Sequence, residues 1–270
     1  MKITFIGGGN MANALIGGLL GKGFAAADIT VIELSAEGRE RLSASYGVRT
    51  CAAPDAAAMA CDVVVLAVKP QQMQTATVPM LPHLGKQLVV SIAAGLRMED
   101  LSRWLGGHRQ LVRTMPNTPA LIGAGITGLC ALPEVDASGR QHAEQVLQAV
   151  GSTVWINDET RMDAVTAVSG SGPAYVFLFI EALQKAGESL GFTPEQARQL
   201  AIETTLGAAK LAAQSPEPAS VLRERVTSKG GTTEAALKKM DECGVLDGIV
   251  AGVCAADARG RELGEQLGRD

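Results

Sequence analysis

Aromatic residues are scarce in this sequence, and it lacks an excess of basic charge. Phe, Trp and Tyr make up 3% of the 270 residues, whereas hydrophobic residues as a whole make up 47%. The core must therefore be built mainly from Ala, Val, Leu and Gly, which favours helices and Gly-rich turns over an aromatic-rich β-sandwich. The formal net charge is −4, whereas a general nucleic-acid binder is expected to be basic. We therefore expect no nucleic-acid partner.

Cysteines and long apolar runs are also few. No two of the five cysteines have Cys-x-x-Cys spacing, so the sequence predicts neither a metal site nor a disulfide framework, and reduced thiols fit a cytoplasmic protein. The apolar start of the chain is too short for a secretion signal. The most apolar later run, 174–183, is interrupted by Glu181 and is too short to span a bilayer. We expect a soluble cytoplasmic protein with no membrane partner.

Short apolar runs alternate with helical patterns over residues 1–158. The runs predict strands at 2–6, 29–33, 63–68, 88–92, 111–114, 125–132 and 153–156. Continuous apolar runs of this length are typical of strands that are buried on both faces, as in a parallel sheet. Predicted helices lie between them at 10–21, 37–46, 71–80, 98–105 and 137–150. This alternation predicts an α/β Rossmann domain with a doubly wound, mainly parallel sheet.

Residues 159–270 show no convincing strand and are predicted to form a separate all-α domain. Helices are predicted at 158–169, 173–190, 194–214, 219–227, 233–243 and 246–267. The helix from Pro173 is apolar on nearly every face, so it must be buried all round. A small helical domain cannot easily enclose such a helix alone. The sequence therefore predicts a homo-oligomer, namely an obligate dimer or a multiple of dimers.

The first predicted strand runs into a Gly-rich loop that opens a helix. The segment 7–12 reads Gly-Gly-Gly-Asn-Met-Ala and fits the pattern G-x-G-x-x-A. Gly7 allows the tight turn, Gly9 lets a pyrophosphate approach the backbone, and Ala12 permits close packing of helix and strand. The helix N-terminus supplies free amide donors for phosphates. A turn without a ligand is the alternative, but the strand–turn–helix context favours a dinucleotide.

The residues after the second predicted strand leave the choice of cofactor open. Glu33 stands where an acidic side chain can bond the ribose 2′-hydroxyl, which favours NAD. Ser35, Arg39 and Arg41 follow and could hold a 2′-phosphate, which favours NADP. A helix start that is capped by Ser35 and carries solvated charges is a third interpretation. The cofactor is NADP or NAD.

Three further loops could line a site. Segments 67–71 and 91–95 follow predicted strands at their carboxyl ends, where ligands of open α/β sheets bind. In the helical half, segment 227–234 places Gly230 and Gly231 before Thr232 and Thr233. Exposed amides beside two hydroxyls can bind a small carboxylate. The alternative is a helix start that is capped by Thr232 or Thr233.

Taken together, the order of these segments resembles the pyrroline-5-carboxylate reductase family, which catalyses the last step of proline synthesis. The matching segments span almost the whole chain and are 7–12, 67–71, 91–95, 115–120, 163–166, 169–175 and 230–233. The sequence departs from the family pattern at Lys229, where the family usually has proline, and at Arg225, where an amide side chain is often found.

The resemblance implies reduction of 1-pyrroline-5-carboxylate to L-proline by hydride transfer from NADPH or NADH. It also implies that the helical domain interlocks with a second subunit. With Glu33 added from the argument above, the predicted cofactor contacts are Ile6, Gly7, Gly8, Gly9, Asn10, Met11, Glu33, Ser35, Ala67, Val68, Lys69, Pro70, Ala93, Ala94 and Gly95. The predicted substrate contacts are Glu159, Gly231, Thr232 and Thr233, with the Thr233 hydroxyl near the ring nitrogen as the catalytic group.

This chemistry agrees with what the sequence lacks. A cyclic imine nitrogen can carry its own proton, so hydride transfer needs positioning more than a strong base. His83, His108 and His142 all lie outside the motifs. No lysine lies between Lys86 and Lys185, which argues against β-hydroxyacid dehydrogenases, since these share the two-domain plan but use a lysine. A dinucleotide-sensing regulator, the other alternative, would have no use for the Gly-Gly-Thr-Thr loop.

Overall fold

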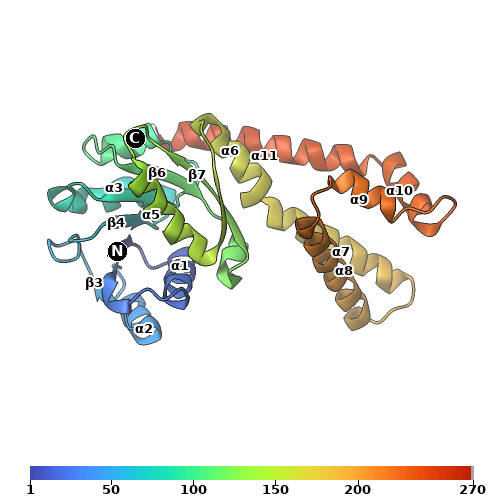
Figure 1. The fold of residues 1–270 in the computed structure, drawn as a ribbon, viewed down its shortest axis with the longest axis horizontal. Coiled ribbons are helices and arrows are strands. Elements are labelled where there is room, and N and C mark those ends of the chain that lie inside the picture. Colours follow the sequence, from blue (N-terminus) through green and yellow to red (C-terminus); the bar gives the residue numbers. More distant parts are fainter. Residues whose placement is uncertain (269–270) are drawn as a thin grey trace. The chain divides into compact units, whose positions relative to one another are not determined.

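The structure is a computed structural model that describes residues 1–268. The chain forms two compact units (Figure 1). Unit 1 is Met1–Ser171 together with the chain from Ala256 onward, and unit 2 is Gly172–Ala255. The predicted domain boundary between residues 158 and 159 follows the change in secondary structure and stays a prediction.

Unit 1 is built on one eight-stranded sheet with the order β3-β2-β1-β4-β5-β6-β7-β8. The strands are β1 (Ile3–Ile6), β2 (Ile29–Ile32), β3 (Arg49–Cys51), β4 (Val63–Leu66), β5 (Leu88–Ser91), β6 (Leu111–Met115), β7 (Gly125–Ala131) and β8 (Gly151–Trp155). All neighbouring strands are parallel except β6 and β7. The first six strands follow the doubly wound order, so the predicted mainly parallel α/β fold is confirmed.

Helices cover both faces of this sheet. The longer ones are α1 (Asn10–Gly21), α2 (Ala36–Tyr46), α4 (Met98–Trp104) and α5 (Ala137–Leu147). The side chains of Phe5 and Val31 pack in one core cluster with α1, α2 and α5, whereas Ile6 and Ile32 pack in another with α4 and the short helix α6 (Met162–Val165). Alternate side chains of each strand point to opposite faces, so two separate cores form.

Two elements of unit 1 differ from the prediction. Strand β3 was not predicted, because it is a three-residue strand at the sheet edge that begins with exposed Arg49 and lacks an apolar run. The predicted helix 71–80 is instead a chain of short pieces: η2 (Pro70–Gln72), α3 (Met73–Thr77) and η3 (Val78–His83). Pro79 and Pro82 lie in the last piece and remove the amide donors that one continuous helix would need.

Unit 2 consists of helices. They are α7 (Gly172–Ser189), α8 (Pro194–Gln214), α9 (Ala219–Arg225), α10 (Thr232–Glu242) and the first part of α11 (Val245–Leu267). Thr193 and Gln196 form a reciprocal capping box at the start of α8, with Pro194 at the first helical position. No strand follows Trp155 in the described chain, so the predicted all-helical second half is confirmed.

Helix α7 is not enclosed by a single copy of the chain. None of its residues is buried, and Phe177 and Leu178 are 65% and 67% exposed. By length and composition alone, the helical stretch 159–189 is long and apolar enough to cross a membrane, which differs from the expectation based on 174–183. That criterion is also met by a helix that packs into a protein core. The apolar surface of α7 therefore needs a covering that one chain does not supply.

Candidate active site

The Gly-rich loop after β1 has the geometry of an anion site. Gly7 has φ +97°, and a Cβ atom there would lie 2.8 Å from the carbonyl oxygen of Ala67. Gly9 is the N-cap of α1, and since it has no side chain, no side-chain oxygen caps the first amides of this helix. A Cβ atom on Gly9 would meet nothing within 4 Å. The first amides of α1 therefore face open space, where a phosphate can approach the backbone.

Asn13 holds this loop from the helix side. Its Nδ2 atom donates to the carbonyl oxygens of Gly8 at 2.8 Å and Gly9 at 2.9 Å. These bonds fix the peptide groups whose amides border the open space. Our reasoning from sequence did not select Asn13, although an amide side chain in the first turn after the loop was a usable signal.

Glu33 and Ser35 form the next part of the same edge. The Glu33 carboxylate accepts hydrogen bonds from the amides of Gly8 and Ser35, both at 2.9 Å. The Ser35 hydroxyl accepts from the amide of Gly38 at 3.1 Å, so Ser35 caps α2 as one of the interpretations proposed. Arg39 donates from one guanidinium nitrogen to the carbonyl oxygens of Glu33 and Leu34. The cofactor roles of Glu33 and Ser35 stay predictions.

The loops after β4 and β5 lie at this edge as well, because both strands run parallel to β1 and follow it in the sheet. The loop after β4 contains Ala67, Val68, Lys69 and Pro70, and the loop after β5 contains Ala93, Ala94 and Gly95. The Ala67 amide donates to the carbonyl oxygen of Ile6 at 2.8 Å. The sheet thus gathers the predicted cofactor residues of unit 1 at the carboxyl ends of β1, β2, β4 and β5.

The end of α11 packs against the loop after β5. Gly95 has φ +79°, and a Cβ atom on it would lie 3.3 Å from Leu267. A Cβ atom on Gly264 would lie 3.0 Å from the Gly95 carbonyl oxygen. The absence of both side chains lets helix and loop approach closely.

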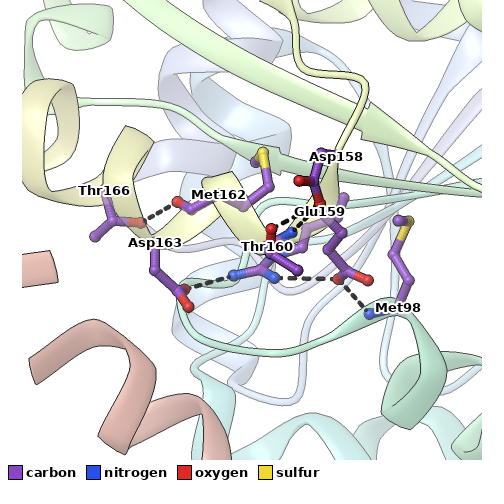
Figure 2. Close-up of polar contacts among 8 residues, drawn as sticks. Met98, Asp158, Glu159, Thr160, Met162, Asp163 and Thr166 are labelled. Carbon is purple, nitrogen blue, oxygen red and sulfur yellow. Dashed lines mark hydrogen bonds and ion pairs between the residues drawn. The ribbon is translucent and has the colours of Figure 1, made fainter. Parts of the chain in front are cut away.

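A buried arginine holds Glu159 in place, and Figure 2 shows its two carboxylate partners, Glu159 and Asp163. Arg113 of β6 is 3% exposed, and its guanidinium donates to Glu159 Oε1 and to Asp163 Oδ1, both at 3.1 Å. Glu159 Oε1 also accepts from the Met98 amide at 2.7 Å. Arg113 was missed from the sequence, although a charged residue inside an apolar strand was a signal.

Arg113, Glu159 and Asp163 line a cavity of about 420 Å³ in unit 1. Arg97, Arg161 and Arg261 also contribute to its wall. Their charges are balanced within the chain. Arg97 pairs with Glu265 at 3.9 Å, Arg161 with Asp158 at 4.0 Å and Arg261 with Asp257 at 2.7 Å. The predicted role of Glu159 as a substrate ligand stays a prediction.

In unit 2, the Gly-Gly-Thr-Thr segment forms the start of α10. Gly231 is the N-cap, so the interpretation of Thr232 or Thr233 as the cap is wrong. Because Gly231 has no side chain, no side-chain oxygen accepts from the first amides of α10. The Gly230 amide donates to Glu234 at 2.7 Å, and Gly230 has φ +73°. Within residues 1–268, the hydroxyl of Thr233 takes part in no hydrogen bond. The Gly231 amide donates to the carbonyl oxygen of Ser228 at 3.0 Å. This helix start therefore presents the unused amides of Thr232 and Thr233 beside an unused hydroxyl.

The two departures from the family pattern lie in unit 2. Arg225, at the end of α9, pairs with Glu217 in the loop between α8 and α9. Lys229 is exposed. Arg225 therefore ties the end of α9 to the preceding loop.

The doubly wound sheet and the open helix N-terminus after β1 define a dinucleotide-binding protein of the Rossmann type. Comparison with known proteins narrows this class. The family model described as pyrroline-5-carboxylate reductase dimerisation matches residues 159–263, and the one described as NADP oxidoreductase, coenzyme F420-dependent, matches residues 2–95. The pyrroline-5-carboxylate reductase of Pseudomonas aeruginosa is 46% identical over 99% of this chain and 98% of its own. The chain belongs to the pyrroline-5-carboxylate reductase family.

Solved structures agree with this assignment. The pyrroline-5-carboxylate reductase of Coxiella burnetii has a TM-score of 0.92 and 41% identity, and the match covers 97% of this chain and 98% of that one. The Plasmodium falciparum pyrroline carboxylate reductase, solved with NADP bound, has a TM-score of 0.86 and 28% identity, and the match covers 98% of each chain. The fold is thus shared over nearly the whole length.

Removing the buried guanidinium tests how firmly Glu159 is held. Arg113→Leu leaves two carboxylates without their partner inside the protein, so we expect the free energy of unfolding to fall by about 3–5 kcal/mol. Arg109→Leu is the matched control, because Arg109 pairs with Glu134 through two bonds but both side chains are about half exposed. We expect that change to cost about 0–1 kcal/mol. Urea unfolding of the two variants measures both values, and equal losses would contradict the argument.

Proposed function

We propose that this chain reduces 1-pyrroline-5-carboxylate to L-proline, with NADPH or NADH as the hydride donor. Membership of the family over the full chain length carries this proposal. The geometry of unit 1 supports it, because the loop at Gly7–Gly9 joins a positive-φ glycine to a helix start with free amides. Such a loop fits a pyrophosphate, which needs amide donors and no side chain in its path.

The cofactor would be held by residues at the carboxyl edge of the sheet. Amides at the start of α1 would face the pyrophosphate, and the loop with Ser35 would face the adenosine ribose. Small residues at Ala67 and Ala93 would leave the backbone accessible to the nicotinamide side. When bound, the reduced cofactor supplies the hydride. NADP is bound in the Plasmodium falciparum relative, and for this chain we propose NADPH or NADH.

The substrate carboxylate would be bound at Gly231, Thr232 and Thr233, through the amides of the two threonines, since the Gly231 amide donates to the Ser228 carbonyl oxygen. A helix N-terminus suits an anion because its first amides lack partners and its dipole favours negative charge. The Thr233 hydroxyl would hydrogen-bond the ring nitrogen and orient the imine carbon. We also propose Glu159 as a substrate ligand through Oε2, because Oε1 already accepts from Arg113 and Met98.

The direct test is an activity assay of the purified chain. Loss of reduced-nicotinamide absorbance should require 1-pyrroline-5-carboxylate, and L-proline should accumulate in equal amount. Supplying NADPH and NADH in separate reactions establishes which donor is preferred. Binding of both cofactors without turnover of the imine would favour a sensing role and overturn the proposal.

We further propose that the chain acts as a homo-oligomer, either a dimer or a multiple of dimers. We also propose a cytoplasmic location and a domain boundary between residues 158 and 159. The exposed apolar face of α7 lies within the segment that matches the dimerisation family model. A second copy would cover that face and make the helical stretch 159–189 an interior element. No membrane is then needed to account for its composition.

A charge placed on α7 tests the oligomer. Phe177→Glu puts a carboxylate on the apolar face, so we expect the oligomer to dissociate or the chain to aggregate, because burying an unpaired charge is costly. Val78→Glu is the matched control, since Val78 is 59% exposed but lies in unit 1. Light scattering at micromolar concentration measures the mass of both variants and the wild type. An active wild-type monomer would contradict the proposal.

A substitution that removes only the Thr233 hydroxyl tests the substrate role. Thr233→Val has a similar volume, and the backbone amides remain. One hydrogen bond to a charged group is worth about 1.5–3 kcal/mol, so kcat/KM for the imine should fall roughly 10- to 150-fold. The KM of the cofactor should not change. Thr205→Val, which removes a hydroxyl bonded within α8, should retain wild-type kcat/KM. If Thr233→Val also retained it, the hydroxyl would have no role in the reaction.

A further inference from the structure

The side chain of Glu33 lies in a slot that two glycines keep open. A Cβ atom on Gly38 would lie 2.9 Å from Glu33 Cγ, and one on Gly8 would lie 3.2 Å from Glu33 Oε2. The Gly8 Cβ would also lie 2.5 Å from a methyl group of Leu42. A larger residue at Gly38 would force Glu33 to shift, and one at Gly8 would crowd its carboxylate. The surroundings are thus shaped to hold this side chain in one place.

Inside this slot, the carboxylate joins two loops. Oε2 accepts from the Gly8 amide in the Gly-rich loop, and Oε1 accepts from the Ser35 amide at the start of α2. The Gly8 carbonyl oxygen is held separately by Asn13. Gly8 is therefore fixed through both its amide and its carbonyl group. Loss of Glu33 would free the loop on the β2 side while Asn13 still held it on the α1 side.

These bonds differ from those of a ribose ligand. A carboxylate that recognises the 2′-hydroxyl must turn its oxygens toward the hydroxyl donors of the ribose. Here each oxygen accepts one backbone amide of the protein itself, and this pair of bonds fixes the direction in which the carboxylate points. The carbonyl oxygens of Glu33 and Leu34 accept from Arg39, which fixes the backbone on the other side. The contacts of Glu33 are thus directed at its own chain.

We infer that Glu33 is a positioning residue that holds the Gly-rich loop for either cofactor and does not select between a ribose 2′-hydroxyl and a 2′-phosphate. The inference rests on the proposed dinucleotide binding. Glu33 would then contribute equally to the affinity for NADH and for NADPH. An acidic residue at this position ordinarily favours NADH.

Direct binding of the two cofactors separates the alternatives. Glu33→Gln puts an NH₂ group against one of the two amide donors, so one bond to a charged acceptor is lost. We expect the Kd values of NADH and NADPH, each measured alone by calorimetry, to rise by the same factor of about ten or more. Their ratio should stay at the wild-type value. A ribose ligand would instead weaken NADH binding and leave NADPH binding unchanged or tighter. That result would overturn the inference, and so would two unchanged Kd values.

A second variant of Glu33 and a control variant complete the experiment. Glu33→Asp retains the charge but is too short to reach both amides, so it should weaken both cofactors equally even if the Gln variant folds poorly. Glu37→Gln removes an exposed carboxylate from the first turn of α2 and should leave both Kd values unchanged. Failure of the proposed function has a different signature, since a wild-type chain that binds both cofactors but does not reduce the imine would leave this inference standing.

Discussion

The close approach of Gly7 to the Ala67 carbonyl is the constraint on which the carboxyl edge of the sheet depends. The predicted cofactor residues of unit 1 gather at this edge. A Cβ atom at Gly7 would lie 2.8 Å from that oxygen, and the backbone has a positive φ, so both space and conformation require glycine. Because the turn is this tight, α1 starts at Asn10, directly beyond the end of β1. The neighbouring strands β1 and β4 then end at the same level, and their loops share one edge. The proposed phosphate site thus follows from two adjacent parallel strands and one residue without a side chain.

Polar groups in unit 1 are mostly used to hold the backbone, and this fits a reaction that depends on geometry. Asn13 and Glu33 fix the Gly-rich loop, and Arg113 fixes Glu159 and Asp163 against the sheet. The loops 7–12, 67–71 and 91–95, which follow strands and carry predicted cofactor residues, contain no histidine. Hydride transfer to an imine that carries its own proton gains mainly from correct placement of donor and acceptor. The proposed site, which consists of backbone amides and loops held by side chains, would supply that placement without a strong acid or base.

The sequence predicted the elements that have a strong periodic or apolar signal, and it failed where the signal came from distant partners. Every strand except β3, as well as the helical second half, follows from apolar runs and their spacing. Strand β3 was missed because Arg49–Cys51 owes its pairing to β2 and not to its own composition. The helix predicted over 71–80 is broken into short pieces, and the last of these contains Pro79 and Pro82, which have no amide to donate. Thr233 could be selected from Gly-Gly-Thr-Thr, but sequence alone could not exclude capping, because the N-cap is decided by the backbone at Gly231. Asn13 and Arg113 act through contacts that exist only in the folded chain.

The scarcity of aromatic residues gives the exposed surface of unit 2 its meaning. The chain has five phenylalanines, and three of them, Phe177, Phe179 and Phe192, are 65%, 48% and 46% exposed in a single copy. A sequence that uses so few large apolar side chains would be expected to place them where they exclude most water, since each buries a large area. Phe5, in contrast, is fully buried in the sheet of unit 1. Both buried core clusters lie in unit 1, whereas unit 2 leaves these phenylalanine side chains exposed in a single copy. The proposed second copy would bury them, so the same association that covers α7 would also complete the fold of the segment that contains Thr233.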